Sequence, residues 1–212
     1  MDFNYAAFYE QLQNEVRTST DLSQSVAKLM EWCAQQMPHA DWARLATFDA
    51  TKETQAARRW LPRVLKREPS PFPVRGAYFG LGEFQDRSGV EFADLYFGLM
   101  SKYDPADSKS EWLFSKPRHY PSKAYLKSKA LKQGGLVCNQ SSTPPGLSTP
   151  GHICFSVGFA ALLLRHVLDG DVYRLLAGVA PIGVVTGFDG GDLLRIGEIT
   201  ANGFLPNENA MA

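Results

Sequence analysis

A short segment around Ser156 has residue types that could support nucleophilic chemistry. The sequence from Cys154 to Gly158, CFSVG, partly matches the G-x-S-x-G turn that exposes a nucleophilic serine, with cysteine in place of the first glycine. The base would have to follow in the sequence, but His166 would lie ten residues farther along the same helix, about 15 Å along its axis. We therefore interpret Ser156 as a small polar residue of a buried helix and keep it as an alternative catalytic candidate.

Cys154 and His152 form a second candidate pair of nucleophile and base. Both lie beside a long polar segment, residues 138–151, with Cys138 at its other end. If the segment folds back, a thiolate and an imidazole could pair, so a small hydrolase or transferase with a nucleophile near residues 138–158 is one alternative function. Structural zinc needs four ligands with closely spaced cysteines, so we predict no metal. We prefer the interpretation of buried, unreactive thiols.

The segment from residue 116 to residue 132 is rich in positive charge. Residues 109–135 contain seven basic side chains and one acidic side chain, a net charge of +6, with Tyr120 and Tyr125 interleaved among them. Such a pattern is typical of surfaces that bind phosphate groups or an acidic partner. The candidate binding residues here are Arg118, Lys123, Lys127 and Lys132. Because the whole chain has zero net charge, a nucleotide or nucleic-acid binder is only an alternative.

Two aspartates flank a glycine pair in Asp189-Gly190-Gly191-Asp192. Their carboxylates could bind a cation or a partner, but the glycines are also what a tight hairpin turn requires. We prefer the turn and keep Asp189 and Asp192 as candidate binding residues. The phosphate-binding patterns GxGxxG and GxxxxGK[ST] do not occur in the chain, and we predict no cofactor.

Apolar residues at helical spacing predict the helices that position these candidates. We expect a helical pair within residues 1–37 and single helices at 49–66, 122–133 and 153–168. Pro62 should kink or split its helix, and Gly134-Gly135 should end the helix before it. Residues 138–151 should form a long loop, and the helix 153–168, apolar on nearly all sides, should be central to the core.

Two hairpins are predicted, residues 77–84 with 90–100 and residues 179–188 with 193–200, and residues 112–114 could add a short strand. Gly80 and Gly82 would face one side of the first hairpin and let another element approach closely, or they would mark a bulge.

The order of these elements predicts an α+β fold. We expect an antiparallel or mixed sheet built from hairpins, packed against the N-terminal helical pair and the buried central helix. We also expect a single domain, residues 1–212, helical up to about residue 68 and sheet-rich afterwards.

Composition and charge restrict the classes of function. The chain is 44% hydrophobic and 21% charged, which is typical of a globular protein with a packed core. Three cysteines suit a reducing compartment, and residues 1–16 do not resemble a signal peptide, so we predict a cytoplasmic protein with no membrane span. With no dominant catalytic motif, we predict a non-catalytic protein-binding module, of the kind that immunity or inhibitor proteins represent, with a protein partner.

Overall fold

The helices lie in two groups along the chain. The computed structural model describes residues 3–87, 89–122, 125–140, 147–168, 170–176, 181–190 and 193–207. Within them the α-helices are α1 (Tyr5–Thr18), α2 (Leu22–Gln36), α3 (Asp41–Leu45), α4 (Ala50–Arg67), α5 (Lys129–Gln140), α6 (Ser148–Val167) and α7 (Gly170–Leu175). Asn4, Asp21 and Asp49 accept backbone hydrogen bonds at the starts of α1, α2 and α4 and so fix where those helices begin.

The strands form one mixed sheet. They are β1 (Gly76–Gln85), β2 (Glu91–Met100), β3 (Arg118–His119), β4 (Ile182–Phe188), β5 (Leu193–Thr200) and β6 (Gly203–Pro206), in the spatial order β3-β2-β1-β4-β5-β6. Neighbouring strands are antiparallel except β1 and β4, which are parallel and pair Tyr78 with Val185 and Gly80 with Gly187. The predicted α+β class, built from hairpins with a mixed sheet, is confirmed.

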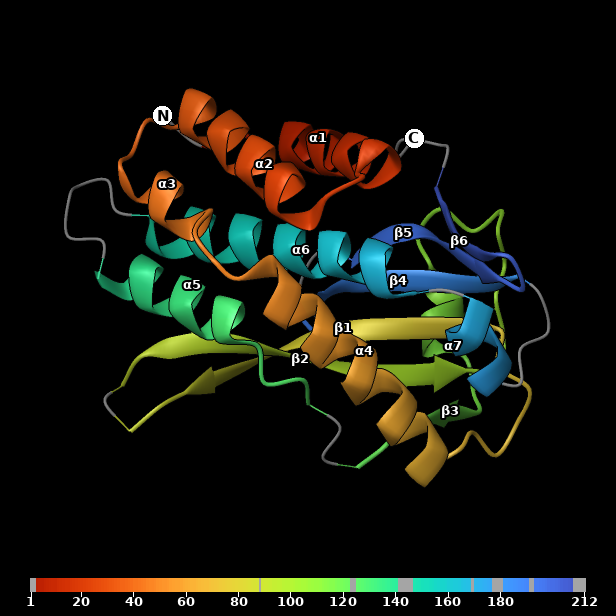
Figure 1. Cartoon of the computed structure of the whole chain (residues 1–212). Helices are drawn as coiled ribbons and strands as arrows, with labels where there is room; N and C mark the ends of the chain where they lie inside the picture. Colours follow the sequence, from red (N-terminus) through yellow and green to blue (C-terminus); the bar gives the residue numbers. More distant parts are fainter. Residues whose placement is uncertain are drawn as a thin grey trace.

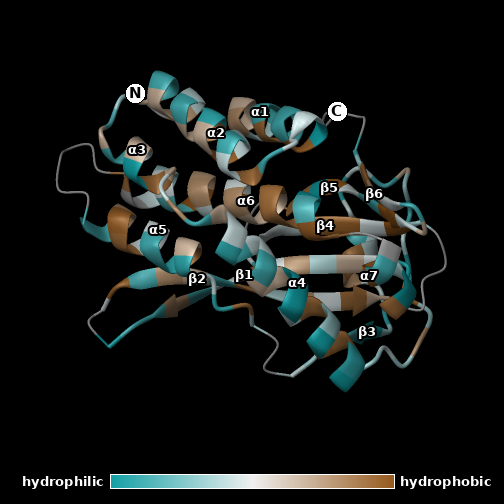
Figure 2. Cartoon of the chain, viewed as in Figure 1, coloured by the Kyte–Doolittle hydropathy of each residue, from teal (hydrophilic) through white to brown (hydrophobic). Residues whose placement is uncertain are grey.

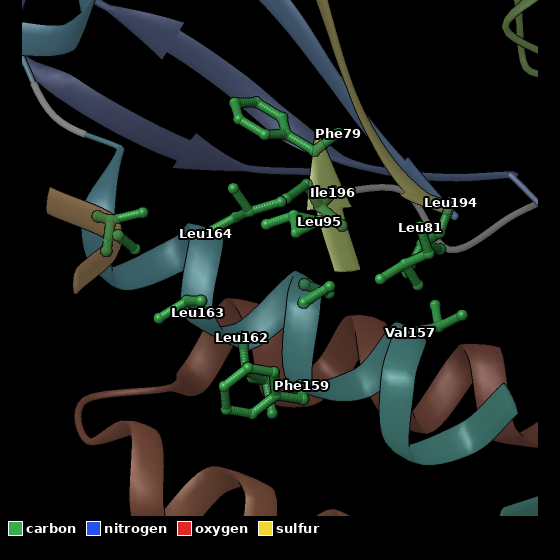
Figure 3. Packing of buried hydrophobic residues seen from close by; sticks show 14 of the residues in the cluster. Phe79, Leu81, Leu95, Val157, Phe159, Leu162, Leu163, Leu164, Leu194 and Ile196 are labelled. Atoms are coloured by element: carbon green, nitrogen blue, oxygen red, sulfur yellow. The ribbon is translucent and has the colours of Figure 1, made fainter. Parts of the chain in front are cut away.

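Helix α6 lies at the centre of the core. One of its sides contacts the sheet at β2 and β4, and the other contacts α1 and α2 (Figure 1). Figure 3 shows Leu164 and Val157 pointing toward the sheet side chains Ile196 and Leu81, while Phe159 points the opposite way. Gly158 of α6 faces Leu29 of α2. A Cβ at position 158 would lie 2.5 Å from a methyl carbon of Leu29, so the close contact between the two helices requires glycine. The predicted buried central helix is confirmed.

Helix α6 is also long enough and apolar enough to pass a length and hydropathy test for a membrane span. Residues Thr149–Val167 pass that test, but 72% of the apolar window is buried within the protein. Figure 2 shows hydrophobic residues recurring along α6 and β4, whereas the visible side of α4 is mostly hydrophilic. Burial of this kind is what the core helix of a globular domain requires.

Helix α5 differs from its prediction. We expected a helix over residues 122–133 that ends at Gly134-Gly135, but α5 runs from Lys129 to Gln140 and continues through both glycines. Buried Glu53 of α4 sets its start, because its carboxylate accepts hydrogen bonds from the Ser128 hydroxyl at 2.8 Å and the Ala130 amide at 3.1 Å. The two glycines do not end the helix but allow it to pack closely. A Cβ on Gly135 would lie 2.3 Å from the carbonyl oxygen of Glu91 in β2.

Three other expectations were partly wrong. Pro62 does not split α4, which is continuous from Ala50 to Arg67. Residues 112–114 belong to a 3-10 helix, η1 (Glu111–Phe114), and not to a strand. The predicted loop 138–151 is shorter, because its two ends extend α5 and α6, and residues 141–146 lie outside the described residues.

The close contact at Gly135 predicts an unusual response to alanine. In an open helix, Gly→Ala stabilises by about 1 kcal/mol. We expect Gly135→Ala to lower the free energy of unfolding by about 2 kcal/mol instead, because the new methyl group pushes α5 away from the β2 backbone. Urea denaturation measures the change. Gln133→Ala, at an exposed position of the same helix, is the control and should change stability by less than about 0.5 kcal/mol. Equal stabilities for the two variants would contradict this packing.

Candidate binding site on the outer face of the sheet

The sheet has a second face, which points away from α6 and which we call the outer face. Successive side chains of a strand point to opposite faces. Phe79 and Leu81 of β1 therefore join the core beneath α6, whereas Tyr78 and Gly80 point to the outer face. The segment that includes η1 covers part of this face and forms a small second apolar cluster with it, made of Tyr78, Met100, Trp112, Leu113 and Val185.

Glycines on the outer face are covered by aromatic rings. In the β1–β2 register, Gly80 lies opposite Tyr96, and Gly98 lies opposite Tyr78. A Cβ on Gly80 would be 2.4 Å from the Tyr96 ring, and one on Gly98 would be 2.2 Å from the Tyr120 ring. The rings therefore lie directly on the backbone, which confirms that Gly80 permits a close approach.

A cavity of about 270 Å³ opens among these rings. Its lining consists of Tyr78, Tyr96, Met100, Leu113, Phe114, Arg118, Tyr120, Asp189 and Leu193. We call it the tyrosine pocket. Its members come from β1, β2, η1, β3, the turn after β4 and the start of β5, so the folded sheet is needed to assemble it.

Asp189 organises the tyrosine pocket. Its Oδ1 accepts a hydrogen bond from the Tyr96 hydroxyl and another from the Tyr78 hydroxyl at 3.1 Å, and the Tyr78 hydroxyl is also 3.0 Å from the carbonyl oxygen of Gly187. Burial, followed by the negative charge of Asp189, raises the pKa of Tyr78. Burial and the hydrogen bond to Asp189 raise the pKa of Tyr96. Both phenols therefore stay protonated and hold the carboxylate in place.

Two predicted binding residues meet in this pocket. Arg118 and Asp189, 71 positions apart in the sequence, both line it. Both are exposed, and the Arg118 guanidinium forms no ion pair or hydrogen bond with any residue that the structure describes. The Oδ2 atom of Asp189 likewise accepts no hydrogen bond within the described part of the chain. A guanidinium and a carboxylate oxygen are thus both available to a ligand.

Exposed aromatic side chains continue the pocket along the outer face. We call Phe84, Tyr96, Tyr120 and Tyr125 the aromatic strip. Their ring centroids are 5.1 Å apart for Phe84–Tyr125, 5.6 Å for Tyr96–Tyr125 and 6.4 Å for Tyr96–Tyr120. Phe84, Tyr120 and Tyr125 are 36%, 46% and 41% exposed, and Phe114 at the pocket is 65% exposed. Among the described residues, the remaining exposed large apolar side chain is Leu205 on β6, so the others are concentrated on one surface.

The other predicted binding residues lie beside the strip or outside the described chain. Lys132 places its Nζ 5.5 Å from the centroid of the Phe92 ring. Lys127 and Lys132 act electrostatically on Asp94, a partly buried outer-face residue of β2. Burial raises the pKa of Asp94 to about 6 even though both lysines lower it. Lys123 and Asp192 lie outside the described residues.

Of the predicted catalytic residues, His152 lines a cavity of about 210 Å³, but Cys154 and Ser156 are not among the residues that line it. Cys154 is fully buried and Ser156 is 2% exposed. Burial first, and then neighbouring Cys33, raise the pKa of the Cys154 thiol, so a thiolate is disfavoured. His152 is half-buried and stacks on Phe188, 5.5 Å between ring centroids. The Nε2 atom of His166 is hydrogen-bonded to the Ser19 hydroxyl at 2.8 Å and not to Ser156. This geometry gives the catalytic alternative no support.

No metal site is evident in the part of the chain that the structure describes. Histidine, cysteine, aspartate and glutamate side chains do not gather there in groups of three or more that could hold a metal ion. The prediction of no metal remains a prediction, because Asp192, in the turn after β4, lies outside the described residues.

Sequence reasoning missed Tyr78, Tyr96 and Phe114. The two tyrosines stand inside strands, where aromatic residues normally indicate core. The available signal was the alternation of glycine with aromatic residues in β1 and β2, which marks a face where rings lie on the backbone.

The burial of the cysteines predicts slow thiol chemistry. We expect Cys33, Cys138 and Cys154 to resist a thiol reagent at neutral pH in the folded protein and to react once urea unfolds it. Burial supplies the reason, and for Cys138 it raises the pKa to about 12. The variant Leu205→Cys is the control and should react at once at its exposed position. Rapid labelling of Cys154 in the folded wild type would instead support the hydrolase or transferase alternative.

The raised pKa of Asp94 predicts a stability that depends on pH. The folded pKa of about 6 exceeds the ordinary value of 3.8, so the folded state binds more protons between these values and stability falls as pH rises through them. We expect Asp94→Asn to stabilise the protein at pH 7 by about 1 kcal/mol, a value reduced for solvent screening. Urea denaturation at pH 7 and pH 4 should show this gain shrinking at the lower pH. A gain that is equal at both values would refute the assignment.

Comparison with known proteins gives no family. No protein-family model matches the chain, and neither a curated protein nor a solved structure matches it. The function therefore has to be argued from the outer face itself.

Proposed function

We propose that this chain is a non-catalytic protein-binding domain that binds its partner through the outer face of the sheet, with the tyrosine pocket at the centre. The observation that carries the proposal is the concentration of exposed aromatic side chains on this face. Contiguous exposed apolar surface is costly in water and typically marks an interaction site.

The residue types of the outer face suit a protein interface. Tyrosine, phenylalanine and arginine are enriched at interface centres, because they contribute large contact areas or directional hydrogen bonds. Tyr96 and Tyr120 are already held against glycine backbone, so little conformational entropy is lost when a partner covers them.

The charges around the strip favour a protein over a nucleic acid. Tyr120, Tyr125 and Lys127 are the stacking and cationic residues that a single strand would use. However, the carboxylates of Asp94 and Asp189 lie on the same face and would repel phosphate groups. A protein can match both signs with its own side chains, and such matching raises association rates at low salt.

Proteins of the immunity or inhibitor type fit this proposal. They act by occupying a partner's surface and need no catalytic residues of their own. Three buried, unpaired cysteines are compatible with the reducing cytoplasm, where we propose that the protein acts.

Substitutions within and outside the strip test the proposal. Tagged wild type, Phe84→Asp, Tyr120→Asp and the control Leu205→Asp would be used to capture partners from a nuclease-treated lysate of the source cells. We expect a stoichiometric protein that binds wild type and the control but loses at least about tenfold in affinity for the two strip variants, as for interface hot spots. Release of that protein by salt would support electrostatic steering.

Two outcomes would refute the proposal. A partner bound equally by all four proteins would place the interface elsewhere. A ligand that is captured only when the nuclease treatment is left out would favour the nucleic-acid alternative through the segment 116–132.

A further inference from the structure

The tyrosine pocket has the size of an anchor for one side chain. Its volume of about 270 Å³ is below the roughly 300 to 1,000 Å³ that is usual for pockets that enclose a whole small molecule. Interface hot spots commonly insert a single side chain into a pocket of the partner. If the proposed function is correct, the chemistry of this pocket should indicate which side chain enters.

Three oxygen atoms of the residues that line the pocket act as acceptors toward a ligand. The protons of the Tyr78 and Tyr96 hydroxyls are committed to Asp189 Oδ1 and the Gly187 carbonyl oxygen. Toward a ligand, these two phenol oxygens can therefore only accept. Asp189 Oδ2 adds a charged acceptor that the described residues leave unoccupied. The Tyr120 hydroxyl and the Arg118 guanidinium, which also line the pocket, can donate. The three acceptors around Asp189 favour a ligand group that donates several hydrogen bonds.

Aromatic rings around the acceptors favour a cation. Tyr78 and Tyr96 meet edge to face with centroids 5.9 Å apart, and Tyr96 and Tyr120 follow at 6.4 Å. The faces of such rings attract a lysine ammonium or an arginine guanidinium. Two hydroxyl hydrogen bonds hold the neighbouring carboxylate in place, so little reorganisation is needed when a cation binds.

Arg118 also lines the pocket, but no described residue holds its guanidinium in place. It is exposed on β3, and its long side chain can turn toward solvent, whereas Asp189 is held by two tyrosines. An acidic side chain could reach Arg118, but inside the pocket it would face the Asp189 carboxylate and no free phenol donor from Tyr78 or Tyr96. The charge that the structure holds in place at the pocket is therefore negative and complementary to a basic side chain, while Arg118 can pair with an acidic group nearby.

We infer that the tyrosine pocket receives a single lysine or arginine side chain of the partner protein, with Asp189 as its counter-ion and Arg118 free to pair with a neighbouring acidic residue. This inference rests on the proposed function and names the chemistry of the partner's anchor. It predicts that partner segments combine a basic residue with an acidic one close by.

Capped amino acids test the pocket without knowledge of the partner. N-acetyl-arginine amide and N-acetyl-lysine amide would be titrated into the full-length protein, with N-acetyl-citrulline amide as the uncharged match for arginine. Amide chemical shifts of β1 and β2 report binding. We expect saturable shifts at Tyr96 and Gly98 with the two cationic probes and affinity about tenfold lower for citrulline, in line with a charge-assisted hydrogen bond.

Variants assign the effect to Asp189. We expect Asp189→Asn to weaken arginine binding about tenfold and Tyr96→Phe, which keeps the ring but frees the carboxylate, to weaken it less. Asp171→Asn, an exposed aspartate on α7, is the matched control and should bind like wild type. Preserved amide spectra show that each variant is folded.

Several results would overturn the inference. These are equal binding of citrulline and arginine, unchanged binding in Asp189→Asn, shifts only with N-acetyl-aspartate amide or adenosine monophosphate, or no saturable shift at all. If the cationic probes fail while capture of the partner still depends on Phe84 and Tyr120, the anchor chemistry is wrong and the proposed function stands. If the cationic probes bind but the strip variants capture the partner as well as wild type does, the pocket binds a cation and the proposed function is wrong.

Discussion

Close contact at glycines is the constraint on which both sides of the sheet depend. On the helical side, Gly135 lets α5 lie directly on the backbone of β2, and Gly158 lets α6 approach Leu29 of α2. On the outer face, Gly80 and Gly98 carry the rings of Tyr96 and Tyr120. A methyl group at any of these positions would collide with atoms less than 3 Å away, so the layers could not keep their separation. The same missing atoms therefore position the core helix and the candidate site.

Strand alternation keeps these two uses of the sheet apart. In β1, Ala77, Phe79 and Leu81 are buried beneath the helices, while the residues between them form the outer face. A shift of one residue in the pairing of β1 would exchange the faces and place Tyr78 under α6. The apolar demand of the buried helix thus fixes the register, and the register in turn fixes which aromatic residues remain available to a partner.

The elements that the sequence predicted correctly are those with strong local patterns. The long apolar run of α6 and the polar turn sequences of both hairpins determine structure within a few residues. The prediction misplaced helix α5 because tertiary contacts determine where it begins and ends. Glu53, 75 residues before Ser128, sets its start, and Gly134 and Gly135 contact other elements of the fold. Local propensity cannot indicate that a glycine pair is needed for packing.

The candidate site was only half predictable for a similar reason. Arg118 and Asp189 were recognisable as charged residues in a basic segment and a turn, but nothing local indicates that they share a pocket. Their meeting depends on the parallel pairing of β1 with β4, which sets Gly187 beside Gly80. Because neither glycine has a side chain, the Tyr96 ring can lie across β1 at Gly80, and its hydroxyl reaches Asp189 in the turn after β4.

The position of the Tyr96 ring across β1 explains why the Asp189 carboxylate, on an exposed turn, is part of an ordered site. Asp189 alone would be a solvated, mobile side chain with a weak field. With Oδ1 bound by phenols from two different strands, its orientation is set by the sheet, and its second oxygen keeps its charge directed at whatever enters the pocket. Because two phenol hydrogen bonds already orient the carboxylate, little reorganisation is needed when a cation approaches it. The fold of the sheet and the orientation of the Asp189 carboxylate are thereby linked through the same two tyrosines, Tyr78 and Tyr96.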